Sequence, residues 1–267
     1  MNRIDRCFSE LEKRSEKALI CFVTSGDPDY DTTEKVVSEI VKCGCDIVEL
    51  GIPFSDPLAD GPSIQASAFR ALKGGARVSG CFDNLRAIRT RCDAPILFMT
   101  YYNPVQKYGV GRFAKDAADA GADGVIMTDL PPEEASQWKS AADSAGLATV
   151  FLLAPTSTKD RITVAANMAS GFVYCVSRTG VTGARDEVPA EVKELVGTIK
   201  AACELPVVVG FGISNPEHVR QVTEFADGAV VGSALINVMA DHADSGDAVQ
   251  RAGEFVRNLK QGVAVRE

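Results

Sequence analysis

Three acidic residues stand close together at the end of one short apolar segment. Glu49 lies inside the segment 46–50, and Asp56 and Asp60 follow in the loop that Pro53 opens. A short β-branched segment bounded by Gly and Pro predicts a buried strand. A carboxyl group buried there either finds a partner or keeps its proton, and both outcomes suit proton transfer. Glu49 is therefore a candidate general acid or base.

Each of these acids also has a purely structural interpretation. Glu49 could be satisfied by a backbone N–H or an arginine, and an aspartate beside Pro or Gly is common in turns. Chemistry is favoured by the combination of a strand-end acid, a rigid loop and a second acid within reach.

Glycine-rich turns follow the last three predicted strands. They are 180–183, then 210–212, and finally Gly232 with Ser233 at the start of a short helical segment. Bare backbone N–H groups and a helix N-terminus stabilise an anion without Lys or Arg, so a phosphate site is predicted here. The alternative is that these glycines only permit tight turns.

The polar segment 178–187 has glycines that could act as hinges, and we expect a mobile lid. Its closure would bring Thr182 toward Asp60. The alternative is a surface loop without a catalytic role.

The elements that must position these residues alternate along the whole chain. Strands are expected at 19–24, 46–50, 95–101, 124–129, 148–154, 172–177, 206–210 and 228–231, with helices that include 31–42, 110–120, 132–145, 159–168, 189–202, 216–225 and 248–260. Helix ends such as 120–124 and 225–228 repeat small residues, where Gly is expected to supply a left-handed cap.

Eight such units without a G-x-G-x-x-G motif favour one closed (β/α)8 barrel, a TIM barrel, over an open sheet. Residues 1–267 are expected to form this single domain, with Ile4, Cys7, Phe8 and Leu11 on an extra amphipathic N-terminal helix. Active-site residues should then lie at the carboxyl ends of the strands. The candidates there are Phe22, Glu49, Asp60, Tyr101, Asn103, Asp129, Tyr174 and Thr182, of which Phe22 and Tyr174 could instead be core aromatics and Asp129 a turn cap.

Composition narrows the class of partner. A net charge of −8 argues against nucleic acid or an anionic membrane as the main partner. The eight cysteines and two histidines lack metal-ligand spacing, so no metal site is expected. We expect the cysteines to be reduced thiols in a cytoplasmic protein. The charged N-terminus is unlike a signal peptide, and no apolar run reaches membrane-spanning length.

The motifs together closely resemble the tryptophan synthase alpha chain family. The match includes 22–28, 48–61, 177–183 and 210–213, in order, and extends over nearly the whole chain. The strand acid followed by Gly, Pro, Phe-Ser-Asp-Pro and Asp-Gly is its most specific part.

The resemblance implies a lyase that splits indole-3-glycerol phosphate into indole and glyceraldehyde 3-phosphate by a retro-aldol reaction, without metal or organic cofactor. Glu49 would move the protons and Asp60 would accept from the indole N–H. The indole slot would comprise Phe22, Tyr101, Ile126, Leu152 and Phe211. Tyr174 would hydrogen-bond Glu49 or orient substrate, and Thr182 would lie with the substrate-binding residues. The phosphate would bind Gly183, Gly212, Gly232 and Ser233.

The resemblance also implies a partner, a pyridoxal-phosphate-dependent beta chain in an alpha2beta2 assembly that receives indole through a channel. The expected contact surface contains Asp56, Pro57, Asn103 and Asp129. Tyr102 and Pro104 depart from the commoner pattern near this surface, and a free-standing lyase that releases indole is an alternative.

Two further alternatives differ in class. A non-enzymatic activating subunit would not need both Glu49 and Asp60. Indole-3-glycerol phosphate synthase or phosphoribosylanthranilate isomerase would be expected to use a Lys or Cys at a strand end, and no predicted strand contains a lysine.

Overall fold

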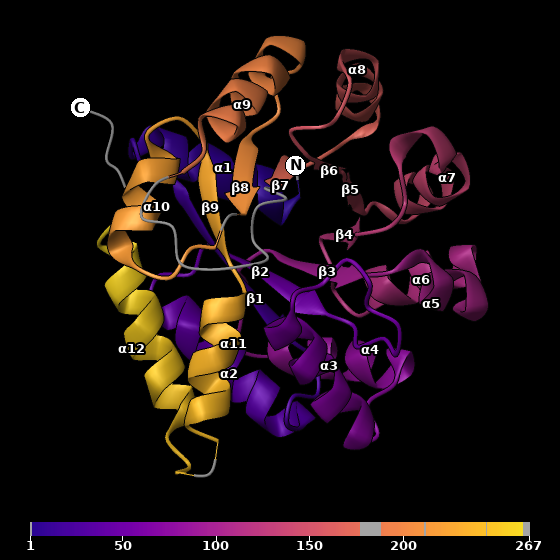
Figure 1. The fold of residues 1–267 in the computed structure, drawn as a ribbon. Coiled ribbons are helices and arrows are strands. Elements are labelled where there is room, and N and C mark those ends of the chain that lie inside the picture. The colour runs from indigo at the N-terminus through magenta and orange to yellow at the C-terminus, as the bar shows by residue number, and fades with distance from the viewer. Residues whose placement is uncertain (1, 177–187, 211, 244, 264–267) are drawn as a thin grey trace.

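The computed structural model describes residues 2–176, 188–210, 212–243 and 245–263. Within them the strands are β1 (Ala18–Thr24), β2 (Ile47–Gly51), β3 (Ile96–Thr100), β4 (Gly124–Met127), β5 (Ala148–Val150), β6 (Leu152–Leu153), β7 (Val173–Val176), β8 (Val207–Gly210) and β9 (Gly228–Val231). All paired strands are parallel, in the order β5-β4-β3-β2-β1-β9-β8-β7-β6. Strands occupy the centre and helices surround them (Figure 1).

The sheet closes on itself through its fifth predicted strand. Only Phe151 separates β5, which pairs with β4, from β6, which pairs with β7. The carbonyl of Phe151 also accepts from the N–H of Tyr174, at 3.1 Å. The expected (β/α)8 barrel is therefore confirmed, with the expected strand 148–154 broken in its middle.

The helices are α1 (Arg3–Lys13), α2 (Tyr30–Lys42), α3 (Pro62–Lys73), α4 (Val78–Arg89), α5 (Tyr102–Tyr108), α6 (Val110–Asp119), α7 (Ser136–Ala145), α8 (Lys159–Met168), α9 (Ala190–Ala202), α10 (Pro216–Thr223), α11 (Ser233–Asp241) and α12 (Ala248–Lys260). The expected helix 132–145 divides into a short 3-10 turn, η1 (Pro132–Glu134), and α7. Helices α3, α4 and α5 were absent from the sequence prediction. None of the three has a side-chain cap at its N-terminus, whereas a capping box of Asn2 and Asp5 begins α1.

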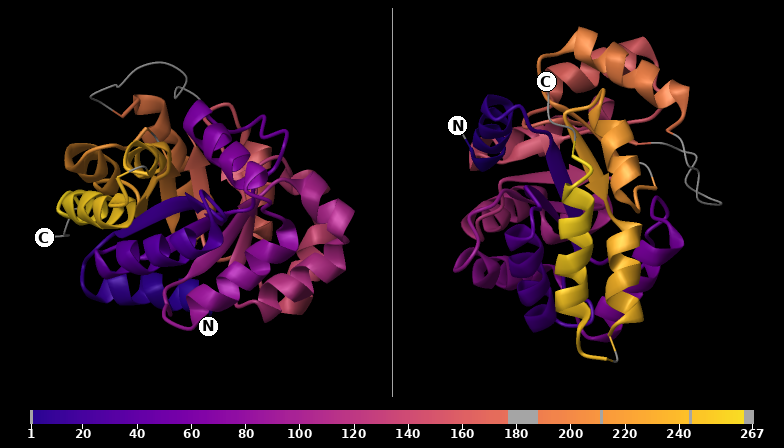
Figure 2. Two further views of the ribbon diagram at one scale, coloured as in Figure 1. Left: turned by 90° about the horizontal axis from the view of Figure 1, so that it is seen from below. Right: turned by 90° about the vertical axis from the view of Figure 1, so that its left-hand side faces the viewer.

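The expected N-terminal helix covers the amino ends of the strands. Ile4, Phe8 and Leu11 of α1 are buried against the barrel interior, where the rings of Phe8 and Phe172 lie 5.9 Å apart. In the right-hand view of Figure 2, α1 lies beside the N-terminus on one side of the barrel. The opposite end, where the strands finish, is the face seen in Figure 1. Helix α1 thus closes the end of the barrel that is remote from the candidate site.

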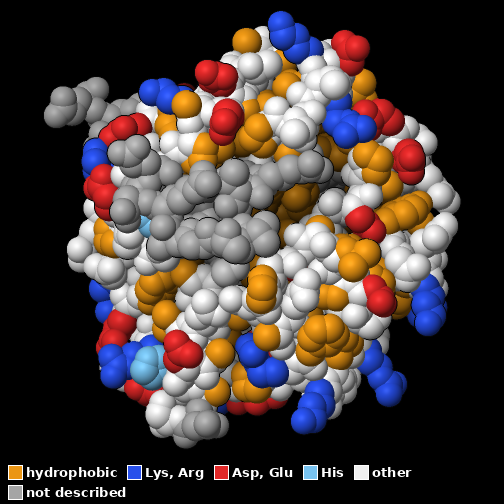
Figure 3. Space-filling view, viewed as in Figure 1, with side chains coloured by type: hydrophobic (Ala, Val, Ile, Leu, Met, Phe, Trp, Pro, Cys, Tyr) orange, Lys and Arg blue, Asp and Glu red, His pale blue; other side chains and the backbone are white. Residues whose placement is uncertain are grey.

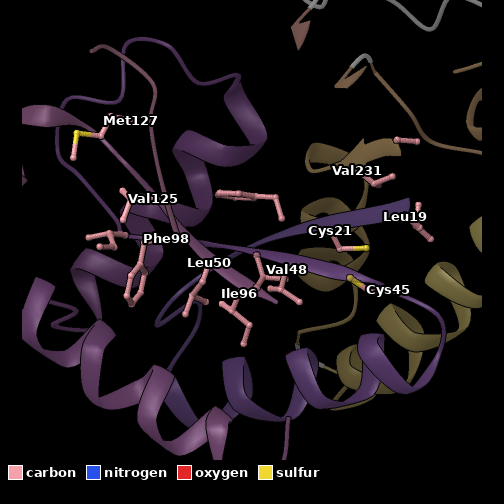
Figure 4. Close-up of a cluster of buried hydrophobic side chains, with 14 of the residues drawn as sticks. Leu19, Cys21, Cys45, Val48, Leu50, Ile96, Phe98, Val125, Met127 and Val231 are labelled. Carbon is pink, nitrogen blue, oxygen red and sulfur yellow. The ribbon is translucent and has the colours of Figure 1, made fainter. Parts of the chain in front are cut away.

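Strand alternation divides the core into two layers. Ile20, Ile47, Leu97 and Ile126 face the barrel interior, whereas their neighbours face the surrounding helices. Figure 4 shows part of this outer layer, including Cys21, Val48, Leu50 and Phe98. A polar residue on the inner face of a strand is consequently directed into the barrel.

A reciprocal pair of hydrogen bonds recurs at the amino ends of the strands. In each case a short polar residue that precedes one strand donates its backbone N–H to the carbonyl of a residue on the neighbouring strand. Its side chain accepts the backbone N–H of that neighbouring residue. All of these hydrogen bonds are 2.8 to 3.0 Å long. The pairs are Asp46 with Leu19, Asp123 with Ile96, Ser170 with Thr149, and Asp227 with Val207. The repeated segments 120–124 and 225–228 therefore each contain an aspartate, Asp123 or Asp227, that helps to fix the register of the strands.

Glycine has a different role in the two copies of that theme. Gly121 does adopt a left-handed conformation, with φ of 96°. The left-handed cap predicted for 225–228 is wrong, because Gly228 is a residue of β9. A Cβ there would lie 3.0 Å from the Cβ of Ala18 on β1. Close strand packing, rather than a helix cap, requires glycine at this position.

Ser170→Ala tests the reciprocal pair without removing a charge. Loss of the Ser170 hydroxyl leaves the Thr149 N–H without this acceptor, so the free energy of unfolding should fall by about 1 kcal/mol. Urea unfolding of both proteins measures the change. Ser144→Ala, on the exposed face of α7, is the control and should cause no loss. Equal stability of the Ser170 variant and the wild type would contradict the assigned role.

Candidate active site

Glu49 lies on β2 and faces the interior of the barrel. Glu49 lies two positions after Ile47, which belongs to the interior cluster, so both side chains are on the same face of β2. Glu49 is in register with Phe22 on β1 and Leu97 on β3. Its side chain is 1% exposed, and Oε1 has no hydrogen-bond partner among the described residues. Burial raises the pKa of Glu49 to about 8. Glu49 therefore keeps its proton at neutral pH, which is one of the two outcomes expected from the sequence.

Asp60 lies in the loop between β2 and α3 and is less deeply buried. Burial raises its pKa to about 6, against the opposing effect of a hydrogen bond with Tyr101. Asp60 is nevertheless mostly ionised at pH 7. The two acids hold different charges at the same pH, a pattern typical of an acid–base site.

A cavity opens at the carboxyl ends of the strands. Of the predicted catalytic and substrate-binding residues, Phe22, Asp60 and Tyr101 line it. It is also lined by residues that the sequence analysis missed, among them Thr24, Ile64, Met99 and Thr128. Met99 and Thr128 follow Leu97 and Ile126 by two positions, so strand alternation alone could have found them.

Two glycines make room for aromatic rings beside the acids. A Cβ on Gly51 would lie 2.6 Å from the ring of Phe22, and a Cβ on Gly210 would lie 2.5 Å from the hydroxyl of Tyr174. Tyr174 is buried, and its pKa is raised first by burial and then by the charges of Glu49 and Asp60. Tyr174 thus lies in the electrostatic field of both acids.

The other predicted pocket residues lie deeper in the barrel. Ile126 is fully buried in the interior cluster, and Leu152 packs against that cluster. Glu49 itself is two residues deeper on its strand than Gly51, which lines the cavity. The acids therefore lie at two depths, with Asp60 beside the opening and Glu49 below it.

Part of the predicted phosphate site is described. Gly232 follows β9, and Ser233 begins α11, whose first turn contains no acidic residue. A Cβ on Gly232 would lie 3.6 Å from atoms of both Phe22 and Ile64, so this corner adjoins the cavity. Gly212 has φ of 37° with no atom within 4 Å of its Cβ position. The free N–H groups at the start of α11 are suited to an anion.

Three predicted residues fall outside the described parts of the chain. They are Thr182, Gly183 and Phe211. The expected lid 178–187 also lies outside the described residues.

The predicted partner surface is largely exposed. Asp56, Asn103 and Asp129 are exposed, and Asp129 accepts a hydrogen bond from the N–H of Tyr102 at 2.7 Å. Pro57 is instead buried and lines the cavity. Its neighbour Leu58, which the sequence analysis did not select, is 92% exposed. Figure 3 shows hydrophobic side chains near the middle of this face, with Lys and Arg mainly toward its rim.

The arrangement of acidic, histidine and cysteine side chains bears on a possible metal centre. Among the described residues, no group of three or more His, Cys, Asp or Glu side chains could hold a metal ion. The eight cysteines are free thiols, and six of them are buried. None of the described helices is both long and apolar enough to cross a membrane.

Burial of Glu49 predicts a pH-dependent stability. Its folded pKa of about 8 exceeds the ordinary 4.5, so between these values the folded chain binds the extra proton. Relative to Glu49→Gln, the wild type should lose about 1.4 kcal/mol of unfolding free energy per pH unit across this interval, and no more above pH 8. Urea unfolding of both proteins from pH 5 to 9 measures this. Parallel pH profiles would contradict the burial of an uncompensated carboxyl group.

Comparison with known proteins gives one consistent family. Residues 8–264 match the family model described as tryptophan synthase alpha chain. The chain is 50% identical to the tryptophan synthase alpha chain of Geobacter sp. (strain M21) over 263 residues, which is 98% of both chains. It is 49% identical to that of Geobacter sulfurreducens, covering 98% of this chain and 99% of the relative.

Solved structures agree with the sequence comparison. The structure of tryptophan synthase subunit alpha from Legionella pneumophila superimposes with a TM-score of 0.91 at 38% identity, covering 98% of each chain. A structure of tryptophan synthase from Mycobacterium tuberculosis in its ligand-free form gives 0.88 at 35% identity, covering 98% of this chain and 99% of that one.

Proposed function

The chain belongs to the tryptophan synthase alpha chain family, and from this premise we propose that Glu49 and Asp60 are its two catalytic groups. The family is a lyase of tryptophan biosynthesis that cleaves indole-3-glycerol phosphate into indole and glyceraldehyde 3-phosphate, and this is the activity of the chain. The observation that supports the two roles is the contrast between a protonated Glu49 below the cavity and an ionised Asp60 beside its opening.

Cleavage of the bond between indole C3 and the glycerol chain needs two proton movements. Protonated Glu49 first donates to C3, and the positive charge that develops at the indole nitrogen is stabilised by the carboxylate of Asp60, which accepts the N–H. Glu49, now ionised, then takes the proton of the hydroxyl on the carbon attached to C3. The C–C bond breaks, its electron pair restores the indole ring, and the hydroxyl carbon becomes the aldehyde. Glu49 ends protonated, so each turnover regenerates the starting state.

The rest of the substrate is assigned to residues around and below the cavity. Phe22, Tyr101, Ile126, Leu152 and Phe211 are proposed as the apolar surround of the indole ring, with Tyr174 and Thr182 as polar contacts. Gly183, Gly212, Gly232 and Ser233 are proposed to bind the phosphate through N–H groups and the Ser233 hydroxyl. An anchored phosphate would hold the reacting bond near both acids.

Assembly with a beta chain is part of the proposal. The Mycobacterium tuberculosis neighbours are structures of tryptophan synthase. We propose that this chain pairs with a pyridoxal-phosphate-dependent beta chain in an alpha2beta2 assembly and itself carries no cofactor. The contact would involve Asp56, Asn103 and Asp129, with Leu58 beside Pro57 as the exposed apolar residue.

Two coarser features complete the proposal. Residues 1–267 would form one domain, because β1 pairs with both β2 and β9 and α12 packs against α2, which joins the two ends of the chain. A cytoplasmic location would suit the eight free thiols.

The required charge states predict a bell-shaped pH profile. Activity needs ionised Asp60 and protonated Glu49, so kcat/KM should rise with pH near 6 and fall near 8. Indole release measured from pH 5 to 9 tests this. Asp83→Asn, an exposed residue of α4, should leave both limbs in place. A rate that keeps rising above pH 8 would show that ionised Glu49 is the starting form.

The direct test of the whole proposal is indole release from indole-3-glycerol phosphate by the purified chain, alone and with a beta chain. Turnover that is stimulated by the beta chain supports both the sites and the partner. Turnover without any effect of a beta chain would indicate a free-standing lyase and overturn the proposed assembly.

A further inference from the structure

The loop that carries Asp60 ends in a turn whose tip is exposed to solvent. It runs from the end of β2 to Gly61. The ring of Phe54 lies 5.4 Å from that of Tyr101 and Pro57 is buried, but the tip residue Leu58 is 92% exposed, so Leu58 adds little packing to the turn. Within the loop, the N–H of Asp60 donates to the carbonyl of Pro57 at 3.0 Å and forms a tight turn. The position of Asp60 then depends on what holds this turn.

Two side chains from outside the loop hydrogen-bond the backbone of residues 57–60 in the described structure. The hydroxyl of Tyr101 accepts from the N–H of Ala59 at 3.0 Å. The carboxamide of Gln65 donates to the carbonyl of Asp60 at 2.9 Å and lies 3.4 Å from the carbonyl of Pro57. Gln65 thus bridges both ends of the turn, and one of its bonds is to the backbone of the catalytic aspartate itself.

Gln65 can act as a fixed support because α3 is itself anchored to the barrel. Further along α3, the hydroxyl of Ser67 lies 2.6 Å from that of Thr24 at the end of β1. Arg70 of the same helix donates two hydrogen bonds, at 2.8 and 2.7 Å, to the carboxylate of Asp27, which is 1% exposed. Helix α3 is therefore fixed relative to β1, and Gln65 on this helix supports the turn that contains Asp60.

We propose that Gln65 is a positioning residue for the cleavage reaction, which holds the carbonyl of Asp60 so that its carboxylate faces the cavity. This inference rests on the proposed role of Asp60. Gln65 does not line the cavity and needs no contact with the substrate. Its effect should therefore appear in kcat, because Asp60 acts on charge that develops only during the reaction.

Gln65→Met is the test, since it keeps the length of the side chain and removes the donor. Its kcat for indole release should fall by about 10- to 100-fold with KM changed less than about twofold. Release of the turn should also hydrate Asp60, so the acid limb of the kcat/KM profile should move to lower pH. Tyr101 and Tyr174 are the titratable groups coupled to Asp60, and both stay neutral over this range.

Gln250→Met is the matched control, because Gln250 lies on the exposed face of α12 and bonds only to the nearby Glu254 among the described residues. It should leave kcat and the acid limb unchanged. A normal kcat in Gln65→Met, or a reduced kcat with an unmoved acid limb, overturns the positioning role. Full turnover in Asp60→Asn instead overturns the proposed function, and the inference with it. An inactive Asp60→Asn beside a normal Gln65→Met overturns the inference alone.

Discussion

Glu49→Gln is expected to lower kcat for indole release by about 1,000- to 10,000-fold, with little change in KM. Glutamine has nearly the same shape, so the buried position on β2 should still pack, but its amide cannot donate a proton to C3 or accept one from the hydroxyl. Because a single carboxyl group serves both steps, its loss removes both proton transfers. Steady-state measurement of indole release with saturating substrate gives the change.

The control is Glu10→Gln, an exposed position on α1 at the opposite end of the barrel, which should retain full activity. The Glu49 variant should also be at least as stable as the wild type at pH 8, because it avoids burial of a charge. Low activity can then be separated from poor folding. Turnover within tenfold of the wild type would exclude Glu49 as the proton-transfer group.

Asp60→Asn is expected to lower kcat by about 100- to 1,000-fold. The amide can keep a hydrogen bond to Tyr101, but it carries no charge to stabilise the cation that develops on the indole ring. The acid limb of the pH profile near 6 should disappear at the same time, since that limb is assigned to the ionisation of Asp60. The measurement is kcat/KM for indole release from pH 5 to 9.

Asp143→Asn is the control for this prediction, because Asp143 is an exposed residue of α7 that pairs with Lys139. It should retain both the rate and the acid limb. If the acid limb persisted in Asp60→Asn, another group would have to titrate there, and the assignment of Asp60 would fail.

The barrel could be predicted because its signal is local and repeated. Each β-branched segment is short and is followed by a helical pattern, and the repetition of eight such units leaves few other folds. The same locality explains the errors. The interruption at Phe151, for example, depends on the different partners of β5 and β6. Contacts between segments far apart in the sequence cannot be predicted from the spacing of apolar residues within one segment.

The candidate site shows the same division. The alternation of residues in β2 was enough to place Glu49 in apolar surroundings, and the family motif was enough to select Asp60. The pKa difference between them required the structure, because it depends on how completely other segments exclude water from each carboxyl group. Gln65 gave no sequence signal, since its importance arises from two carbonyl groups that the loop turns toward it.

Residue types and their order were enough to predict the kind of element at most positions, the closed barrel and the family, and to propose Glu49 and Asp60 as the catalytic acids. Those properties depend on residue type and spacing along the chain. Only the packed fold shows the depth of each acid, the burial of Pro57 beside an exposed Leu58, and the support of the Asp60 turn by Tyr101 and Gln65. These properties depend on which residues exclude water or meet across space, and that is fixed only when the strands and helices pack together.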